Sequence, residues 1–174
     1  MTRVAYLGPA GTFTEEAARR FGVEGAQYVP VESPAAALAA LDAGEAEYAV
    51  CAIENSIDGA VTTTMDALAA TESARIVGET ELAIAFAVMT RQGHKLDDAL
   101  RLATHPVALQ QVKRWIGAHA PKAEFIPAPS NAAAAKMVAD GAADVAVAPE
   151  RAAALHGLEV HARGVAGAGT GRTR

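Results

Sequence analysis

The sequence is poor in the residue types on which several protein classes depend. Its single cysteine, Cys51, excludes an internal disulfide framework and any cysteine-rich zinc or iron–sulfur site. The five histidines never occur as an H-x-H or H-x-x-x-H pair. Because metal sites on one element show such spacings, the sequence has no local metal signature, and we predict no metal site.

Positive charge and long apolar runs are also scarce. Fifteen lysines and arginines stand against 20 aspartates and glutamates, a net charge of -5, so no basic stripe is available to neutralise phosphates. The apolar stretch behind Met1-Thr2-Arg3 is too short for a signal peptide, and no run approaches the length of a membrane span. We therefore expect a soluble, cytoplasmic protein that binds neither nucleic acid nor membrane.

Short apolar runs alternate with alanine-rich helical stretches along most of the 174 residues. This alternation is typical of βαβ units with parallel strands. Helix-start signals occur at Thr14, Ser33 and Ser130. The predicted strands are Val4–Leu7, Tyr28–Val31, Tyr48–Ile53, Glu81–Met89, Arg101–Thr104, Glu124–Pro127 and Asp144–Ala148, and the predicted helices are 14–21, 34–43, 62–70, 106–119, 131–140 and 150–156.

The chain repeats itself. Residues 28–52 and 125–149 align without a gap at an offset of 97, which pairs Pro30 with Pro127 and Ser33 with Ser130. The same offset places residues 7–10 on 104–107. Alanine richness alone would not bring prolines and a serine into register, so we predict a duplication that produces two similar α/β lobes.

Two such lobes have a natural place for a ligand, because open α/β sheets bind ligands outside the carboxyl ends of their strands. With lobes at 1–76 (completed by 158–174) and 77–157, we expect the ligand in a cleft between them. Helix N-termini on both sides favour a small anion with a negative group at each end. The abrupt change from the apolar run 49–53 to Glu54-Asn55-Ser56 marks one such strand end.

Several kinds of chemistry lack their motifs. The loop GPAGTF (8–13) has neither the spacing of a dinucleotide fingerprint nor the Gly-Lys-Ser/Thr of a Walker loop. No nucleophile elbow or Ser-His-Asp order is visible, and Cys51 within an apolar strand is more typical of a core residue than of a nucleophile. A reaction here would depend on placement, hydrogen bonds and one proton donor.

Five segments occur in the order and spacing of prephenate dehydratase catalytic domains, which the chain resembles from about residue 3 to 160. They are YLGPAGTFTEEAA (6–18), IENSIDGAV (53–61), THPVALQQVKRW (104–115), SNAAAA (130–135) and AVAPERAAALHGL (146–158). The resemblance implies an α/β fold of two lobes like type II periplasmic binding proteins. It also implies a lyase that converts prephenate to phenylpyruvate in L-phenylalanine biosynthesis, without a cofactor, because aromatisation drives the reaction.

The resemblance also implies site residues. The catalytic candidates are Thr173, Asn55 and Gln111, with Thr173 and Arg174 taken from the terminal GRTR. A threonine hydroxyl is a very weak acid, so hydrogen-bond stabilisation of the leaving oxygen is the role expected of Thr173. The expected substrate-binding residues are Thr12, Phe13, Glu54, Ser56, Thr104, His105, Ser130, Asn131 and Arg174.

Four of these residues have a purely structural alternative. Asn55 and Ser56 could cap the following helix, His105 could be a satisfied turn residue, and Gln111 could face solvent. Trp115 and Phe125 are expected in the core rather than at the substrate. His94 and Lys95 are expected to be exposed.

The chain also departs from the family pattern. Val107 and Val112 stand where glutamine and cysteine are common, and the tail GVAGAGTGRTR lacks the Asp, Asn and Phe that usually surround the key threonine. We expect no ACT regulatory domain and hence no phenylalanine feedback. A homodimer is one candidate assembly. The open alternatives are a non-aromatising prephenate decarboxylase, an arogenate dehydratase and a non-catalytic small-anion binding protein.

Overall fold

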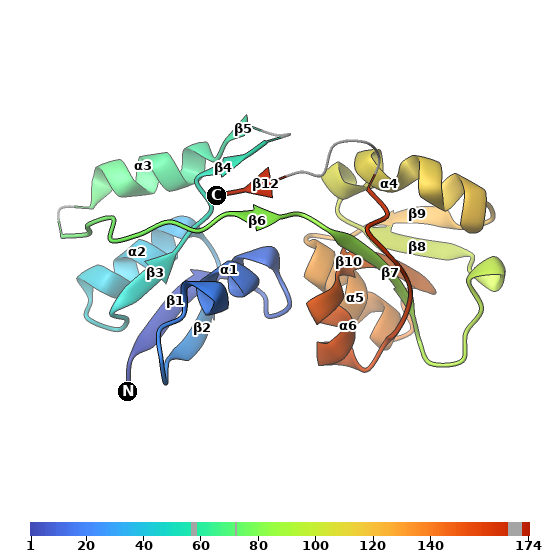
Figure 1. Ribbon diagram of the computed structural model, residues 1–174, viewed down its shortest axis with the longest axis horizontal. Coiled ribbons are helices and arrows are strands. Elements are labelled where there is room, and N and C mark those ends of the chain that lie inside the picture. Colours follow the sequence, from blue (N-terminus) through green and yellow to red (C-terminus); the bar gives the residue numbers. More distant parts are fainter. Residues whose placement is uncertain (57–58, 72, 167–171) are drawn as a thin grey trace. The chain divides into compact units, whose positions relative to one another are not determined.

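The computed structural model describes residues 1–56, 59–71, 73–166 and 172–174. The chain divides into two compact units, with the described residues 1–84 and 172–174 in unit 1 and 85–166 in unit 2 (Figure 1). All six predicted helices are confirmed within one residue at each end. Among the described residues, no helix is both long enough and apolar enough to cross a membrane.

Unit 1 is built on a parallel sheet in the order β2-β1-β3, in which Val4 of β1 lies between Tyr28 of β2 and Tyr48 of β3. Side chains alternate across the sheet. Val4 and Tyr6 therefore pack with Ala18 of α1, whereas Ala5 packs with Ala37 of α2 on the other face. The elements are β1 (Arg3–Leu7), α1 (Phe13–Phe21), β2 (Gln27–Val31), α2 (Pro34–Asp42), β3 (Tyr48–Val50) and α3 (Thr62–Ala70), which packs beside α2.

The start of α1 differs from the sequence prediction. Thr12, not Thr14, is the N-cap, and its hydroxyl accepts a hydrogen bond from the Glu15 backbone N–H at 3.3 Å. The buried Glu15 carboxylate reaches back to the Gly11 N–H at 2.6 Å and is paired with Arg19 at 2.8 Å. Together these bonds hold the GPAGTF loop as a defined turn between β1 and α1.

A second, four-stranded sheet in unit 1 has the order β5-β4-β12-β6. Its strands are β4 (Glu54–Asn55), β5 (Gly59–Ala60), β6 (Leu82–Ala83) and β12 (Arg172–Thr173). The single strand predicted at Tyr48–Ile53 is therefore wrong: β3 ends at Val50, and the next paired residues belong to this other sheet. The strand predicted at Glu81–Met89 is likewise two strands, because the chain passes from unit 1 to unit 2 at Ala85.

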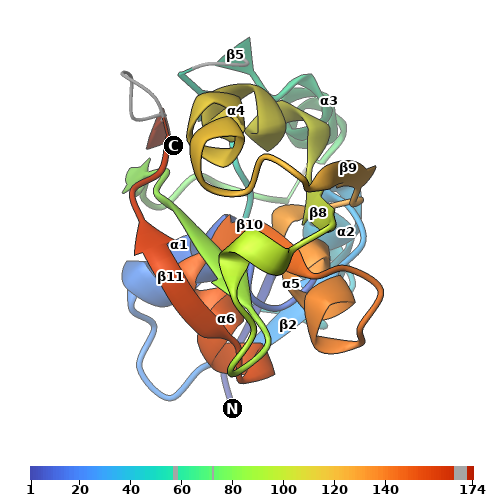
Figure 2. The same ribbon diagram turned by 90° about the vertical axis from the view of Figure 1, so that its right-hand side faces the viewer.

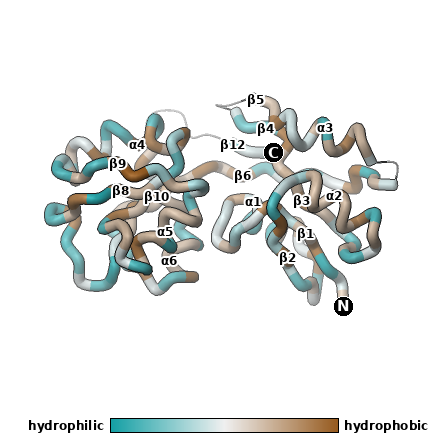
Figure 3. The backbone as a smooth tube through the Cα atoms, turned by 180° about the vertical axis from the view of Figure 1, so that it is seen from behind, coloured by the Kyte–Doolittle hydropathy of each residue, from teal (hydrophilic) through white to brown (hydrophobic). Residues whose placement is uncertain are grey.

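Unit 2 is built on one five-stranded sheet in the order β11-β7-β10-β8-β9, with β7 antiparallel to both of its neighbours. Figures 1 and 2 show α4 on one face of this sheet and α5 and α6 on the other. The buried residues on the sheet face that α5 and α6 cover are mainly alanines. Figure 3 shows hydrophobic residues along the strands of this sheet. The elements are β7 (Phe86–Thr90), the 3₁₀ turn η1 (Leu96–Asp98), β8 (Arg101–Thr104), α4 (Pro106–His119), β9 (Glu124–Pro127), α5 (Asn131–Ala139), β10 (Val145–Pro149), α6 (Glu150–His156) and β11 (Glu159–Arg163).

The predicted duplication is visible in backbone geometry. Ser33 and Ser130 cap α2 and α5 with φ of -155° each, and each hydroxyl accepts a backbone N–H at 3.0 Å. The predicted alignment of 7–10 on 104–107 is wrong by one residue. Val4 faces Tyr48 whereas Leu102 faces Val145, so β1 and β8 correspond at an offset of 98. The segment from β8 to β9, which contains α4, is one residue shorter than the segment from β1 to β2, which contains α1. The offset between the two copies is therefore 98 before these segments and 97 after them.

The unit boundaries differ from the predicted lobes. The chain first passes from unit 1 to unit 2 after residue 84 rather than 76, because β6 pairs with β12 within unit 1. The predicted return to lobe 1 at residue 158 is too early. β11 pairs with β7 and therefore belongs to unit 2.

Candidate functional site

In unit 1 the structure brings Asn55 and Thr173 together, although 118 positions separate them in the sequence. They are paired residues of the antiparallel strands β4 and β12. The Asn55 side-chain amide Nδ2 donates to the Thr173 hydroxyl oxygen at 3.0 Å. Both residues are half-buried. The hydroxyl oxygen accepts from Asn55, so its own hydrogen points away from the Asn55 amide.

Hydrogen bonds between the neighbouring residues Ser56 and Arg172 hold the Asn55–Thr173 pair in place. The Ser56 hydroxyl accepts from the Arg172 N–H at 2.8 Å, and the Ser56 N–H donates to the Arg172 carbonyl at 2.8 Å. The capping alternative for Asn55 and Ser56 is wrong, because α3 begins after Val61 without any side-chain cap. Ser56 instead ties β12 to β4.

Glu54 and Arg174 form the outer part of the same group. Their backbones exchange hydrogen bonds of 3.0 and 3.1 Å, and the Arg174 guanidinium lies 4.0 Å from the Glu54 carboxylate and 3.6 Å from that of Glu79. All three side chains are largely exposed. Glu54 therefore helps to orient a cation at this point.

The two residues predicted from the first loop behave differently. Thr12 is the N-cap of α1, and its hydroxyl also donates to the Leu7 carbonyl at 3.3 Å. Phe13 lines a cavity of about 510 Å³ in unit 1, whose wall also includes Thr173 and Arg174. Of the two, Phe13 shares this cavity with Thr173, and Thr12 supports the loop that carries Phe13.

In unit 2 a second polar group lies at the carboxyl end of β8. The fully buried Thr104 hydroxyl is 3.0 Å from the Val147 carbonyl and 3.2 Å from Asn131 Oδ1. The same amide oxygen accepts from the His105 N–H at 3.1 Å. Thr104, His105 and Asn131 thus form one hydrogen-bonded cluster between β8 and α5.

Two further predicted residues of unit 2 start helices. Ser130 caps α5, and His105 is the N-cap of α4, where its Nδ1 accepts from the Val107 N–H at 3.3 Å. Gln111 is half-buried in α4, which is at odds with the solvent-facing alternative. Its side-chain oxygen Oε1 is buried and has no hydrogen-bond partner among the described residues. A buried acceptor without a partner is unusual in folded proteins and marks Gln111 as a residue to test.

The residues expected to be structural have mixed outcomes. His94 and Lys95 are exposed, as predicted. Trp115 is half-buried and stacks on His119 with ring centroids 4.1 Å apart. The core prediction for Phe125 is wrong, because β9 is the edge strand of its sheet and the residue stays 38% exposed.

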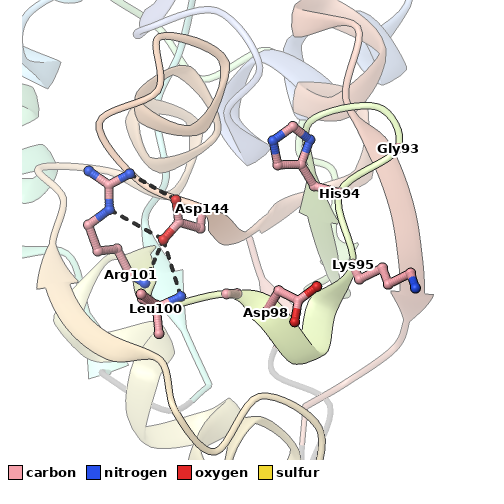
Figure 4. Close-up of a pocket in the computed structure, with 8 residues that line it drawn as sticks. Gly93, His94, Lys95, Asp98, Leu100, Arg101 and Asp144 are labelled. Carbon is pink, nitrogen blue, oxygen red and sulfur yellow. Dashed lines mark hydrogen bonds and ion pairs between the residues drawn. The ribbon is translucent and has the colours of Figure 1, made fainter.

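A hollow of about 630 Å³ lies at the opposite, amino-terminal end of β8. Figure 4 shows Arg101 and the Leu100 backbone directed at Asp144 beside it. The Arg101 guanidinium, aided by the Leu100 and Arg101 N–H groups, holds the pKa of the Asp144 carboxyl below its ordinary value. Asp144 is engaged by these donors and forms a structural ion pair with Arg101 at this end of the unit.

Glu15 is the important residue that sequence reasoning missed. Its signal was present, since Thr12-x-x-Glu15 is a capping-box pattern. For metals, no cluster of three or more potential ligands occurs within residues 1–56, 59–71, 73–166 and 172–174.

Comparisons with known proteins show the family of the chain. Residues 4–174 match the family described as prephenate dehydratase. The chain belongs to the prephenate dehydratase family. A prephenate dehydratase of Corynebacterium glutamicum is 50% identical over 99% of this chain. The match spans only 57% of that relative's length, so the chain corresponds to little more than half of the longer protein.

Two solved structures are similar across nearly the whole chain. A prephenate dehydratase from Arthrobacter aurescens in complex with L-Phe has a TM-score of 0.87 and 35% identity, covering 99% of this chain and 58% of that one. GqqA, described as a novel type of quorum quenching acylase, has a TM-score of 0.86 and 34% identity, covering 98% of this chain and 61% of its own. The family fold thus occurs with two different described activities.

Proposed function

We propose that this chain carries the site of a prephenate dehydratase, a lyase that converts prephenate to phenylpyruvate. The observation that carries the proposal is the contact between Asn55 Nδ2 and the Thr173 hydroxyl at 3.0 Å, in a chain whose residues 4–174 match this family. An amide that fixes a hydroxyl is the arrangement needed to direct one hydrogen bond at a leaving oxygen.

The reaction requires little beyond such a contact. The bond between the ring and its carboxylate breaks, and its electron pair enters the ring as carbon dioxide leaves. The ring hydroxyl departs with its bonding pair and takes up one proton, which gives water. Negative charge therefore develops on the departing oxygen, where a positioned donor lowers the barrier. Aromatisation makes the overall step favourable, so neither a cofactor nor a metal is needed.

Thr173 suits the donor role because of its neighbour. Accepting from Asn55 polarises the hydroxyl and strengthens the hydrogen bond that it can donate. Thr173 is too weak an acid to give up its proton fully at neutral pH. We infer that it stabilises the leaving oxygen while the proton itself comes from a more acidic source.

The other predicted residues fit binding of a dianion. Arg174 offers a cation held by Glu54 and Glu79, and it can exchange one of these partners for a substrate carboxylate. In unit 2, the Asn131 amide oxygen fastens Thr104 and His105, which stiffens the start of α4. Gln111 Oε1 is an acceptor for a substrate hydroxyl. That both groups serve one substrate molecule remains a prediction.

The test follows phenylpyruvate formation from prephenate by ultraviolet absorbance at neutral pH. Thr173→Val keeps the shape but removes the hydroxyl, and we expect kcat to fall by about 10²–10³-fold, the usual cost of losing one donor to a developing oxyanion. Thr173→Ser should restore most of the rate. Asn55→Ala should lower kcat by at least about tenfold.

Ser33→Ala is the matched control for these variants. It also removes one hydroxyl hydrogen bond, but from the cap of α2, so it should lower stability and leave kcat unchanged. An unchanged kcat in Thr173→Val, with the wild type active, would reject the role of Thr173. Saturable prephenate binding without any turnover would instead favour the non-catalytic binding protein.

The acylase described for one structural relative is a second candidate worth testing. Cleaving an acyl–nitrogen bond requires a nucleophile or an activated water. Burial raises the pKa of the Cys51 thiol to about 11, so the single cysteine is protonated at neutral pH and unsuited to attack. We therefore expect no amine release from N-acyl substrates under conditions where prephenate is consumed.

A further inference from the structure

The two copies differ in how the first strand passes into the first helix. In unit 2, the single residue His105 separates β8 from α4. In unit 1, residues 8–12 separate β1 from α1, which has nine residues where α4 has 14. At the offset of 98 that relates β1 to β8, residues 8–12 correspond to 106–110, which are helical in unit 2. A loop in unit 1 therefore takes the place of the first turn of a helix.

This loop, residues 8–12, lies at the same edge of its sheet as the candidate site of unit 1. β1 and β3 are parallel neighbours, so their carboxyl ends lie side by side. The loop follows β1, and the segment that leads to Asn55 follows β3. Ligands of open α/β sheets bind at this edge. Phe13, the first residue after the loop, lines the same cavity as Thr173.

The Glu15 carboxylate holds the loop from inside. The Glu15 side chain is only 4% exposed, and its Oε2 accepts from the Gly11 N–H at 2.6 Å. Gly11 has a φ of 88°, in the left-handed region where a residue with a side chain would be strained. The bond to Glu15 therefore fixes the loop at a position whose backbone conformation favours glycine.

The other carboxylate oxygen holds Glu15 itself in place. Oε1 accepts from Nε and Nη2 of Arg19, each at 2.8 Å. The Arg19 guanidinium in turn lies over the Tyr28 ring of β2, 4.4 Å from the ring centroid. Burying a carboxylate is costly unless it is paired, and here each of its oxygens has a donor. The backbone of Gly11 is thus tied to the sheet through Glu15, Arg19 and Tyr28.

We propose that Glu15 is a positioning residue for the dehydration: it sets the conformation of residues 8–12 and thereby the place of Phe13 in the cavity shared with Thr173. This role rests on the function proposed for the Asn55–Thr173 pair. The Glu15 carboxylate acts through Gly11 and not on the substrate, because both of its oxygens bond within unit 1. A misplacement of about 1 Å around a reacting bond can cost about 10²-fold in rate, so such a tether affects kcat.

The test compares the same substitution at two neighbours in the first turn of α1. Glu15→Gln leaves one oxygen to serve both Gly11 and Arg19, whereas Glu16→Gln makes the same change of charge on an exposed side chain. We expect kcat for phenylpyruvate formation to fall by about tenfold in Glu15→Gln, with KM changed by less than about threefold. Glu16→Gln should leave both constants unchanged. Rates are compared per folded molecule, with far-ultraviolet circular dichroism to verify folding.

A second readout reports on the loop without depending on activity. We expect exchange of the Gly11 amide hydrogen, followed by nuclear magnetic resonance, to be about tenfold faster in Glu15→Gln and unchanged in Glu16→Gln. A merely structural role would lower the urea midpoint, as Ser33→Ala should, and leave kcat per folded molecule as it is.

The outcomes separate this role from the proposed function. If the wild type forms phenylpyruvate and Glu15→Gln keeps its kcat, the positioning role is wrong and the proposed function stands. A lower kcat with unchanged Gly11 exchange would also overturn the role, because the effect would not pass through the loop. A wild type that forms no phenylpyruvate would reject the proposed function and the role of Glu15 together.

Discussion

Removing the Asp144 carboxylate should lower the free energy of unfolding of unit 2. The hydrogen bonds and the exposure of this carboxylate determine by how much. Asp144 accepts from the Arg101 Nη2 at 2.8 Å, from the Arg101 backbone N–H at 3.0 Å and from the Leu100 N–H at 3.2 Å. Its side chain is only 20% exposed, whereas that of Arg101 is 45% exposed. The charge pair is therefore partly screened, and the two backbone donors contribute much of the interaction.

These contacts predict different losses for two variants. Asp144→Asn keeps an oxygen for the backbone donors and loses the ion pair, so we expect a cost of about 1 kcal/mol. Asp144→Ala removes every contact and should cost about 2–3 kcal/mol. Asp140→Asn is the control, because its pair with Lys136 is exposed on both sides and should contribute less than about 0.5 kcal/mol.

Urea unfolding followed by fluorescence measures this directly, since the only tryptophan, Trp115, lies in unit 2. The pKa of Asp144 is lowered in the folded state, so its contribution is present above the ordinary value of 3.8 and is lost as pH falls through the lower, folded value. The difference in unfolding free energy between wild type and Asp144→Asn should be constant from pH 5 to 7 and should shrink below about pH 4. A gap that stays the same down to pH 2.5 would refute the role of the charge.

Two further predictions concern Cys51 and the paired helix caps. Burial raises the pKa of the Cys51 thiol to about 11, so alkylation at pH 7.5 should be about 100-fold slower than for a free cysteine. The rate should rise about tenfold per pH unit up to pH 10, and a plateau near pH 9 would contradict the raised pKa. Ser33→Ala and Ser130→Ala should each cost about 1 kcal/mol in thermal unfolding, because the two caps share one geometry. A negligible cost at either position would show that its bond contributes little.

Local signals predicted the helices and the duplication well. A serine before an alanine-rich run specifies a helix start through its own side chain, so Ser33 and Ser130 needed no tertiary information. The error at Thr14 was also local. Thr14 directly precedes the acidic pair Glu15-Glu16, which is typical of a first helical turn, but the capping box of Thr12 and Glu15 places the start two residues earlier.

Features that depend on distant partners could not be predicted from patterns. The apolar run 48–53 reads as one strand, but β3 ends at Val50. The next strand, β4, begins only at Glu54 and pairs with β12 at the other end of the sequence. Phe125 was assigned to the core by its chemistry. Its exposure depends on β9 being an edge strand, which only the sheet order reveals. The family resemblance implies that Asn55 and Thr173 are both catalytic candidates, but neither it nor any periodicity predicts their hydrogen bond.

The duplication also explains why the polar groups differ between the units. At the offset of 98 the counterpart of Thr104 is Tyr6, and at 97 that of Asn131 is Pro34, so unit 1 has no side chains for the Thr104–Asn131 bond. Conversely, Asn55 and Ser56 correspond to Ala152 and Ala153, which are buried in α6. The shared frame supplies strand ends and helix starts at matching places. The candidates Asn55, Thr104 and Asn131 stand where the two copies diverge, whereas the candidate Ser130 has an identical counterpart in Ser33.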